Sequence, residues 1–154
     1  MFDQMIGSGE PLTEAALASA ENEISRKIPG PFRAFLLKYN GGRPDVADFA
    51  MAAGGGATQP GTIKSFFGIG MPERTFNLDY VLQTFGDRIP AWSFPIARDP
   101  GGNLIVVATS GKNQGKVYFW DHEGEAEEGQ PPAEDNLYLI ANSFDDFLAH
   151  LTKG

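Results

Sequence analysis

The chain has 154 residues, of which 42% are hydrophobic and none is cysteine, a size and composition typical of one packed domain. The lack of cysteine excludes disulfides, thiolate metal sites and cysteine nucleophiles, and it fits a reducing cytoplasmic location. The net charge of −8 disfavours nucleic acid as a partner, because phosphate binding needs a basic surface.

The N-terminal segment lacks the basic region and the long apolar run of a secretory signal. No apolar stretch reaches the length of about eighteen residues that a membrane-spanning helix needs. We therefore expect neither a secretory signal nor a membrane span.

The charge is unevenly placed along the chain. Residues 1–116 hold equal numbers of acidic and basic side chains, whereas residues 117–152 hold nine acidic side chains and no lysine or arginine. A basic protein is a suitable partner for such a segment, because complementary fields speed encounter. The alternative is that the acidic run only solvates a loop.

Two helices are predicted in the first 42 residues. Thr13 suits the N-cap of a helix that runs to about Arg26. Pro31 suits the first turn of the second helix, and residues 40–42 (Asn-Gly-Gly) end it, because glycine accepts the left-handed conformation of a C-cap. The apolar stripe of the second helix consists of Phe32, Phe35, Leu36 and Tyr39.

The middle of the chain predicts less regular structure. Residues 43–61 begin as a possible short strand and continue as a Gly-rich loop, around 54–61, that we expect to be mobile. Residues 62–69 alternate in the manner of a strand. Asn77 can cap a short helix that ends at about Phe85, before Gly86 and Pro90.

The second half of the chain predicts a sheet. Strands at 94–97 and 104–108 flank a turn and form an antiparallel hairpin, and further strands follow at 117–120 and 137–140. Ser143 caps a last helix. The fold class is therefore α+β, a mainly antiparallel sheet of about five to six strands with helices packed on it, in one domain over residues 1–154.

Four segments in the same order resemble the SUKH superfamily, which includes the Smi/Knr-type cell-wall regulators and many bacterial immunity proteins. They are the helix with its Asn-Gly-Gly end at 28–42, a strand–turn–strand element at 94–103, an aromatic strand with an Asp-His-Glu triplet at 115–123, and a closing Ser-Phe helix at 141–148. The resemblance implies a non-enzymatic immunity protein that binds and neutralises a toxin from a contact-dependent or polymorphic toxin system. The alternative that it implies is a regulatory or scaffolding protein of the cell-wall regulator type.

The two histidines are the first candidates for catalytic or metal-binding chemistry. His122, between Asp121 and Glu123, could act as a general base or as a metal ligand. In an extended chain Asp121, Glu123 and Glu125 would point to one side and could hold a hard cation. The segment lacks the spacing of an EF-hand, and His150, predicted on the surface of the last helix, does not complete a zinc site. We predict no catalytic site, no metal and no cofactor.

The partner-binding surface is predicted at the end of strand 117–120. Alternation places Tyr118 and Trp120 on the face opposite Val117 and Phe119. If helices cover one face only, this aromatic pair reaches the other, where tryptophan and tyrosine are frequent interface anchors; the alternative for Trp120 is the core. The predicted binding residues are Trp120, Asp121, Glu123, Glu125, Glu127 and Glu128. The expected partner is a cognate, basic toxin domain, and the protein itself is expected to be a monomer or a weak homodimer.

Overall fold

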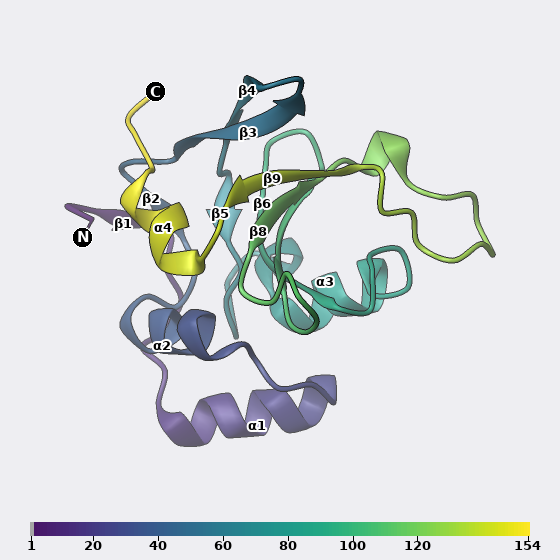
Figure 1. The fold of residues 1–154 in the computed structure, drawn as a ribbon. Helices are drawn as coiled ribbons and strands as arrows, with labels where there is room; N and C mark the ends of the chain where they lie inside the picture. The colour runs from purple at the N-terminus through teal and green to yellow at the C-terminus, as the bar shows by residue number, and fades with distance from the viewer. Residues whose placement is uncertain (1) are drawn as a thin grey trace.

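The computed structural model describes residues 2–154, which form one mixed arrangement of helices and antiparallel sheets (Figure 1). The helices are α1 (Glu14–Ile24), α2 (Gly30–Lys38), α3 (Leu78–Phe85) and α4 (Phe144–Ala149). The strands are β1 (Met5–Ile6), β2 (Arg43–Pro44), β3 (Asp48–Gly54), β4 (Ala57–Thr62), β5 (Ser65–Phe66), β6 (Ser93–Arg98), β7 (Leu104–Ala108), β8 (Val117–Trp120) and β9 (Leu137–Ala141). Short 3₁₀ turns lie at Arg74–Phe76 and His122–Gly124. The α+β fold class is thereby confirmed.

The main sheet is an antiparallel meander in the order β5-β6-β7-β8-β9. The central strand β7 is buried at all five positions, as its continuous apolar run predicts for a strand covered on both faces. Two smaller antiparallel pairs, β1-β2 and β3-β4, lie outside this meander. The predicted hairpin of strands 94–97 and 104–108 and the two later strands are confirmed.

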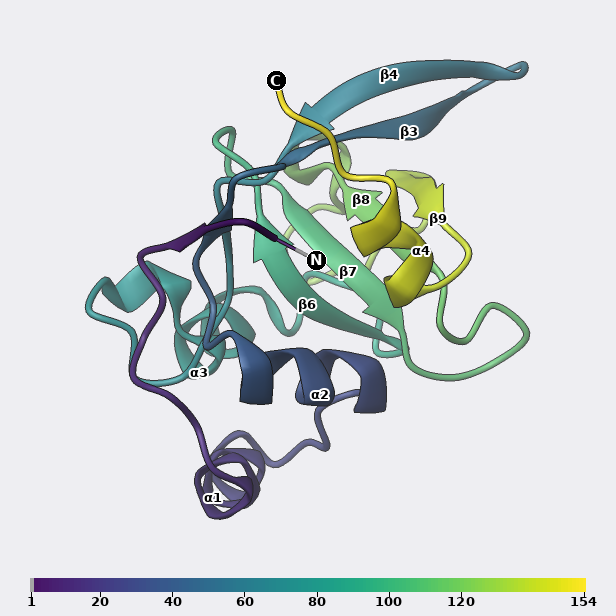
Figure 2. The same cartoon turned by 90° about the vertical axis from the view of Figure 1, so that its left-hand side faces the viewer.

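Helices cover both faces of the main sheet. Directly opposed residues share a face, so the pair Leu104–Trp120 faces one side and the pair Ile105–Phe119 the other. Figures 1 and 2 show α2 and α4 on one side of the sheet and α3 on the other. The face that carries Trp120 is therefore the face under α3, and it is not left open to solvent.

The side under α2 and α4 holds an aromatic core. Phe35 of α2 lies 4.7 Å from Phe66 and 5.4 Å from Phe144 between ring centroids, and Phe66 lies 6.3 Å from Phe147. Phe32 adds a contact of 6.4 Å to Phe94 of β6. These tilted and edge-to-face contacts are the favoured arrangements of aromatic pairs, and they join the second and last helices to the sheet.

The predicted N-caps of two helices are confirmed. The hydroxyl of Thr13 accepts a hydrogen bond from the N–H of Ala16, and that of Ser143 accepts one from the N–H of Asp146. Asn77 precedes α3 as predicted, but its side chain makes no cap for this helix. Its Oδ1 instead accepts a hydrogen bond of 2.6 Å from the N–H of Met71.

The end of α2 has a different explanation from the one that the sequence suggests. The C-cap is Tyr39 in an extended conformation, and Asn40 is buried with its side chain bonded to other segments. The left-handed residues are Gly41 and Gly42. A Cβ on Gly42 would lie 2.9 Å from the carbonyl oxygen of Ile6, so this glycine permits the close approach of the N-terminal segment.

The prediction of a Gly-rich loop at 54–61 is wrong. Phe49 and Met51 are buried and alternate with exposed neighbours, which gives β3 an inward face. The pairing of β3 with β4 runs from Asp48 opposite Thr62 to Gly54 opposite Ala57. Gly54 at the end of β3 and the turn residues Gly55 and Gly56 all have positive φ. The strand predicted at 62–69 is also shorter than expected and is reduced to β5, after which Phe67 is buried like its neighbour Phe66.

Candidate partner-binding surface

The acidic residues gather on the connection between β8 and β9, called here the acidic loop (residues 123–135). The neck of this loop is closed by hydrogen bonds between its two ends. The N–H of Asp121 donates to the carbonyl oxygen of Asn136 at 3.0 Å, and Nδ2 of Asn136 donates to the carbonyl oxygen of Asp121 at 2.9 Å. Because both ends belong to neighbouring strands, the loop starts from a fixed position at the edge of the sheet (Figure 1).

Asp121 and His122 are held against the turn between β6 and β7. Oδ1 of Asp121 accepts a hydrogen bond from the N–H of Glu123 and so begins the 3₁₀ turn. The N–H of His122 donates to Oδ1 of Asn103 at 3.0 Å, and its Nε2 lies 3.0 Å from the carbonyl oxygen of Gly101. The triplet thus ends the strand and docks it on the neighbouring turn.

Arg88, just beyond α3, binds the acidic loop. Its Nε and Nη2 donate to Oε2 and Oε1 of Glu125 at 2.8 and 2.7 Å, the bidentate geometry that makes arginine–carboxylate pairs strong. The same guanidinium lies 4.4 Å from the ring centroid of Phe85 and 5.8 Å from that of Trp120. The hydrogen bond from Arg88 is the main reason why the pKa of Glu125 lies below its ordinary value.

The other carboxylates of the loop remain uncompensated. Within residues 2–154, the acidic loop makes one ion pair, between Arg88 and Glu125. Glu123, Glu127 and Glu128 are exposed and make none. An open pocket of about 670 Å³ lies between the end of α3 and residues 125–132 of the loop. The arrangement can therefore present negative charge around a hollow large enough for a side chain of a partner.

Trp120 does not belong to this surface, which corrects the sequence-based prediction. Its exposed fraction is 0%, because α3 covers the face that strand alternation left open. Phe85 of α3 packs edge-on against the indole at 5.8 Å. Tyr118 is half-buried, and Trp92 packs edge-on against it at 6.0 Å; burial raises the pKa of Tyr118.

The structure does not bring the carboxylates at 121, 123 and 125 together. Asp121 caps the 3₁₀ turn and Glu125 turns to Arg88, while Glu123 is exposed. In residues 2–154 no group of three or more histidine or acidic side chains is placed to hold a metal ion. His150 is exposed at the end of α4, as predicted.

Sequence patterns did not indicate two features of this region. Arg88 and Glu125 are 37 residues apart, and no local pattern connects them, although a cation near a helix C-terminus is favourable on its own. The second feature is the place of β9 as the last strand of the five-stranded sheet, since the sequence of one strand does not determine the order of strands in a sheet. None of the described helices combines the length and the apolar character required to cross a membrane.

The chain is similar in sequence to a known protein and to a protein family. The SPbeta prophage-derived uncharacterized protein YokK of Bacillus subtilis (strain 168) is 29% identical over 156 residues, an alignment that covers 90% of this chain and 74% of that relative. Residues 11–150 match the SMI1 / KNR4 family (SUKH-1). Since this match spans nearly the whole described chain and includes all four segments of resemblance, the protein belongs to the SMI1 / KNR4 family (SUKH-1).

Proposed function

We propose that the protein is a non-enzymatic immunity protein of the cytoplasm, which binds a toxin domain with a basic surface and neutralises it by covering that surface. The observation that carries the proposal is the acidic loop. Its neck is closed at Asp121 and Asn136, and Arg88 holds it at Glu125. The exposed carboxylates beyond these contacts have no cation of their own.

Electrostatics support this partner class. The first 116 residues are neutral overall, so residues 117–154, which contain the acidic loop, supply the whole net charge of the chain. A field concentrated on one side steers a basic partner to that side and rejects acidic partners. The fixed neck reduces the conformational entropy that the loop would otherwise lose on binding.

The residues of the proposed surface have different roles. Glu123, Glu127 and Glu128 are exposed and are proposed to face the partner directly. Glu125 is proposed to position the loop through Arg88, and Asp121 to do so through its 3₁₀ turn. With Trp120 in the core, the proposed surface is electrostatic rather than aromatic.

The prophage origin of the relative supports immunity over a housekeeping role, and family membership fits both. A gene carried by a prophage is not part of the housekeeping set of its host, and a protein that protects its bearer from a related competitor fits such an origin. A regulatory scaffold remains the alternative, and it differs in binding several partners modestly instead of one partner tightly.

The proposal is tested by titration calorimetry with the purified, inactivated toxin-like domain encoded beside the gene. We expect one-to-one binding with a dissociation constant below about 1 μM that weakens steeply as salt is raised. The double variant Glu127→Gln and Glu128→Gln should weaken binding by about tenfold at low salt.

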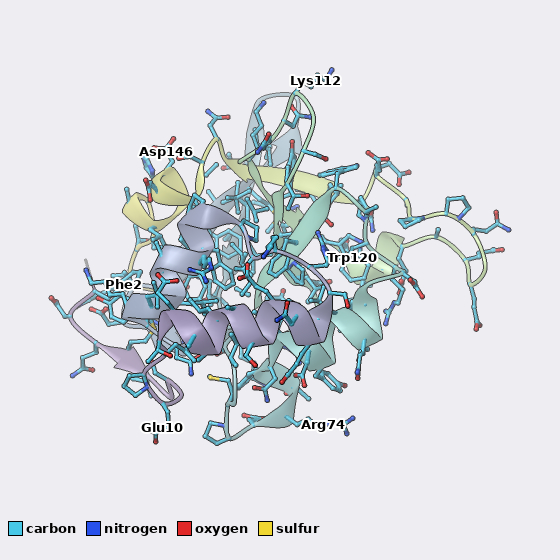
Figure 3. The ribbon with its side chains drawn as sticks, turned by 90° about the horizontal axis from the view of Figure 1, so that it is seen from below. Phe2, Glu10, Arg74, Lys112, Trp120 and Asp146 are labelled. Carbon is cyan, nitrogen blue, oxygen red and sulfur yellow. The ribbon has the colours of Figure 1, made fainter. Side chains whose placement is uncertain are left out.

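A matched control removes two charges elsewhere. Asp3 and Glu10 are exposed, and Figure 3 shows Glu10 at the lower left of the molecule, away from the buried Trp120. The double variant Asp3→Asn and Glu10→Gln changes the net charge equally and should leave affinity within about twofold of the wild type. Equal weakening by both double variants would reject the acidic loop as the binding surface, and modest binding to several housekeeping proteins would favour the scaffold.

A further inference from the structure

The side chain of Asn40 lies where three segments of the chain meet, called here the Asn40 junction. Its Nδ2 donates hydrogen bonds to the carbonyl oxygens of Glu10 and Ile69, and its Oδ1 accepts one from the N–H of Ile69, each at 2.8 Å. The residue is 3% exposed. Both polar atoms of the carboxamide are therefore engaged inside the fold.

Glycines make this junction possible. A Cβ on Gly9 would lie 2.6 Å from Nδ2 of Asn40, and a Cβ on Gly68 would lie 2.6 Å from its Oδ1. Gly41 has a φ of +70°, and a Cβ there would lie 3.0 Å from the carbonyl oxygen of Phe66. The fold thus strongly favours glycine directly after Asn40.

The dipeptide Asn40-Gly41 is also the chemically weakest point among the asparagines. The backbone nitrogen that follows an asparagine can attack the carbonyl carbon of its side chain. This attack is least hindered when the next residue is glycine, which has no side chain and the freest backbone. Each other asparagine of the chain is followed by a larger residue.

The reaction consumes only water and releases ammonia. The backbone nitrogen of Gly41 loses its proton and forms a bond to Cγ of Asn40, the bond between Cγ and Nδ2 breaks, and ammonia leaves. Water then opens the cyclic imide at either of its carbonyl carbons. The product has aspartate or isoaspartate in place of Asn40, and base accelerates the first step because the nitrogen must lose its proton.

The folded state blocks the attack. The N–H of Gly41 donates a hydrogen bond of 2.8 Å to the carbonyl oxygen of Tyr39. Cγ of Asn40 cannot turn toward that nitrogen unless the bonds to Glu10 and Ile69 break. The junction must therefore open before the reaction can begin, and a reaction that needs an open form is slowed by the rarity of that form.

Neither product restores the Asn40 junction. Aspartate places a carboxylate oxygen against the carbonyl oxygens of Glu10 and Ile69, where Nδ2 was the donor, and a buried charge without a partner is costly. Isoaspartate adds a methylene to the main chain directly before Gly41. That addition displaces Gly41 and Gly42 from the close approaches that these residues make to neighbouring carbonyl oxygens.

We propose that Asn40 is a deamidation site that the native fold protects and the unfolded chain exposes, so that deamidation turns reversible unfolding into irreversible loss of the protein. Chemical change of the unfolded state that outpaces refolding makes stability a matter of rate. The lifetime of the protein is then limited by the time that the chain spends unfolded. This inference does not depend on the proposed partner.

Timed incubation of the whole chain in concentrated guanidinium chloride at mildly alkaline pH tests the proposal. Samples are diluted into native buffer, the folded fraction is isolated by size exclusion and measured by tryptophan fluorescence, and peptide mass spectrometry reads residue 40. The fraction that refolds should fall in step with the fraction of intact Asn40, and the refolded protein should retain asparagine at that position.

Two further incubations separate the chemistry from the denaturant. The same time in guanidinium chloride at mildly acidic pH should preserve both Asn40 and the ability to refold, because the backbone nitrogen keeps its proton. In native buffer at the alkaline pH, deamidation of Asn40 should be at least about a hundredfold slower than in the denaturant.

Asn142 supplies the matched control in the same samples, since it is exposed and is followed by Ser143. Chains deamidated at Asn142 alone should refold. The variant Asn40→Asp carries one product directly and should fail to refold under conditions in which Asn142→Asp recovers the native fluorescence.

Three results would overturn the proposal. Deamidation of Asn40 at the same rate in native buffer and in denaturant would show that the fold does not protect it. Loss of refolding with Asn40 intact would assign the irreversibility to another cause. Full refolding of chains deamidated at Asn40, or of the variant Asn40→Asp, would show that the junction accepts the product.

Discussion

Arg88 and Glu125 join the end of α3 to the acidic loop by two parallel hydrogen bonds of 2.8 and 2.7 Å. The guanidinium rests against Phe85 and Trp120, so the ion pair is anchored on the core side by aromatic rings. The carboxylate of Glu125 points inward and serves the fold, and the exposed carboxylates of the loop remain available to the proposed partner.

Replacing Glu125 by glutamine should lower the free energy of unfolding by about 0.5–1 kcal/mol, the upper part of the range measured for exposed ion pairs, because this pair is bidentate and partly buried. The amide keeps one acceptor for Arg88 but loses the charge and the second acceptor. Urea unfolding followed by tryptophan fluorescence measures the change. Glu128→Gln is the control, because Glu128 is exposed and unpaired in the described chain, and it should change the unfolding free energy by less than about 0.5 kcal/mol.

The same ion pair predicts a pH dependence with a definite sign. The pKa of Glu125 is lowered in the folded protein, so the pair stabilises the fold above the ordinary glutamate pKa of about 4.3 and loses this contribution as the pH falls through the lower, folded pKa. The stability difference between wild type and Glu125→Gln should be constant from pH 7 to about pH 5. It should shrink below that, and a difference that grows in acid would contradict the assignment.

Trp120 is predicted to stabilise the fold. Replacing this fully buried indole by alanine should lower the unfolding free energy by about 3–5 kcal/mol, because it leaves a large cavity under α3. Trp92 is the control, since it is partly exposed and contacts Tyr118 at the surface. Trp92→Ala should lower the unfolding free energy by clearly less than Trp120→Ala does. Equal losses in urea unfolding would show that α3 does not seal this face of the sheet.

Much of the fold could be predicted because its signals are local. The caps at Thr13 and Ser143 and the apolar stripe of α2 lie within a few residues of the element that they define. The meander from β6 to β9 was predictable for the same reason, because each strand alternates or is fully apolar and each is bounded by turn residues.

The incorrect predictions share a physical cause: each of these features depends on contacts with residues that are distant in the sequence. Residues 48–62 are rich in alanine and glycine, residues of low strand preference, and they form β3 and β4 because Phe49 and Met51 are buried. Alternation placed Trp120 on the correct face of β8, but only the docking of α3 decided whether that face was open. The partner of Glu125 could not be found either, since Arg88 lies 37 residues away.

Asn40 is predicted to hold three segments together through its side chain. Its Nδ2 donates to the carbonyl oxygens of Glu10 and Ile69, and its Oδ1 accepts from the N–H of Ile69, each at 2.8 Å. Asn40→Asp places a carboxylate oxygen against two carbonyl oxygens and should cost about 3 kcal/mol or more. The exposed Asn142 supplies the control, and Asn142→Asp should be nearly neutral in the same thermal or urea unfolding experiment.

The last prediction concerns Glu21, a buried carboxylate that joins α1 to the start of α2. Its Oε2 accepts a hydrogen bond of 2.9 Å from the buried N–H of Ile28, and its Oε1 lies 3.4 Å from Nε of Arg33. Glu21→Ala should cost about 2 kcal/mol, because the N–H of Ile28 then has no acceptor. Glu23→Ala, at an exposed position of the same helix, should stay within about 0.5 kcal/mol of the wild type.

A second variant separates the hydrogen bond from the charge. Glu21→Gln keeps an oxygen that can accept from Ile28 but removes the attraction to Arg33. If the hydrogen bond dominates, Glu21→Gln should recover more than half of the stability that Glu21→Ala loses in urea unfolding. Equal losses in the two variants would instead assign the contribution of Glu21 to its ion pair with Arg33, since both variants lack the carboxylate that lies 3.4 Å from Nε of Arg33.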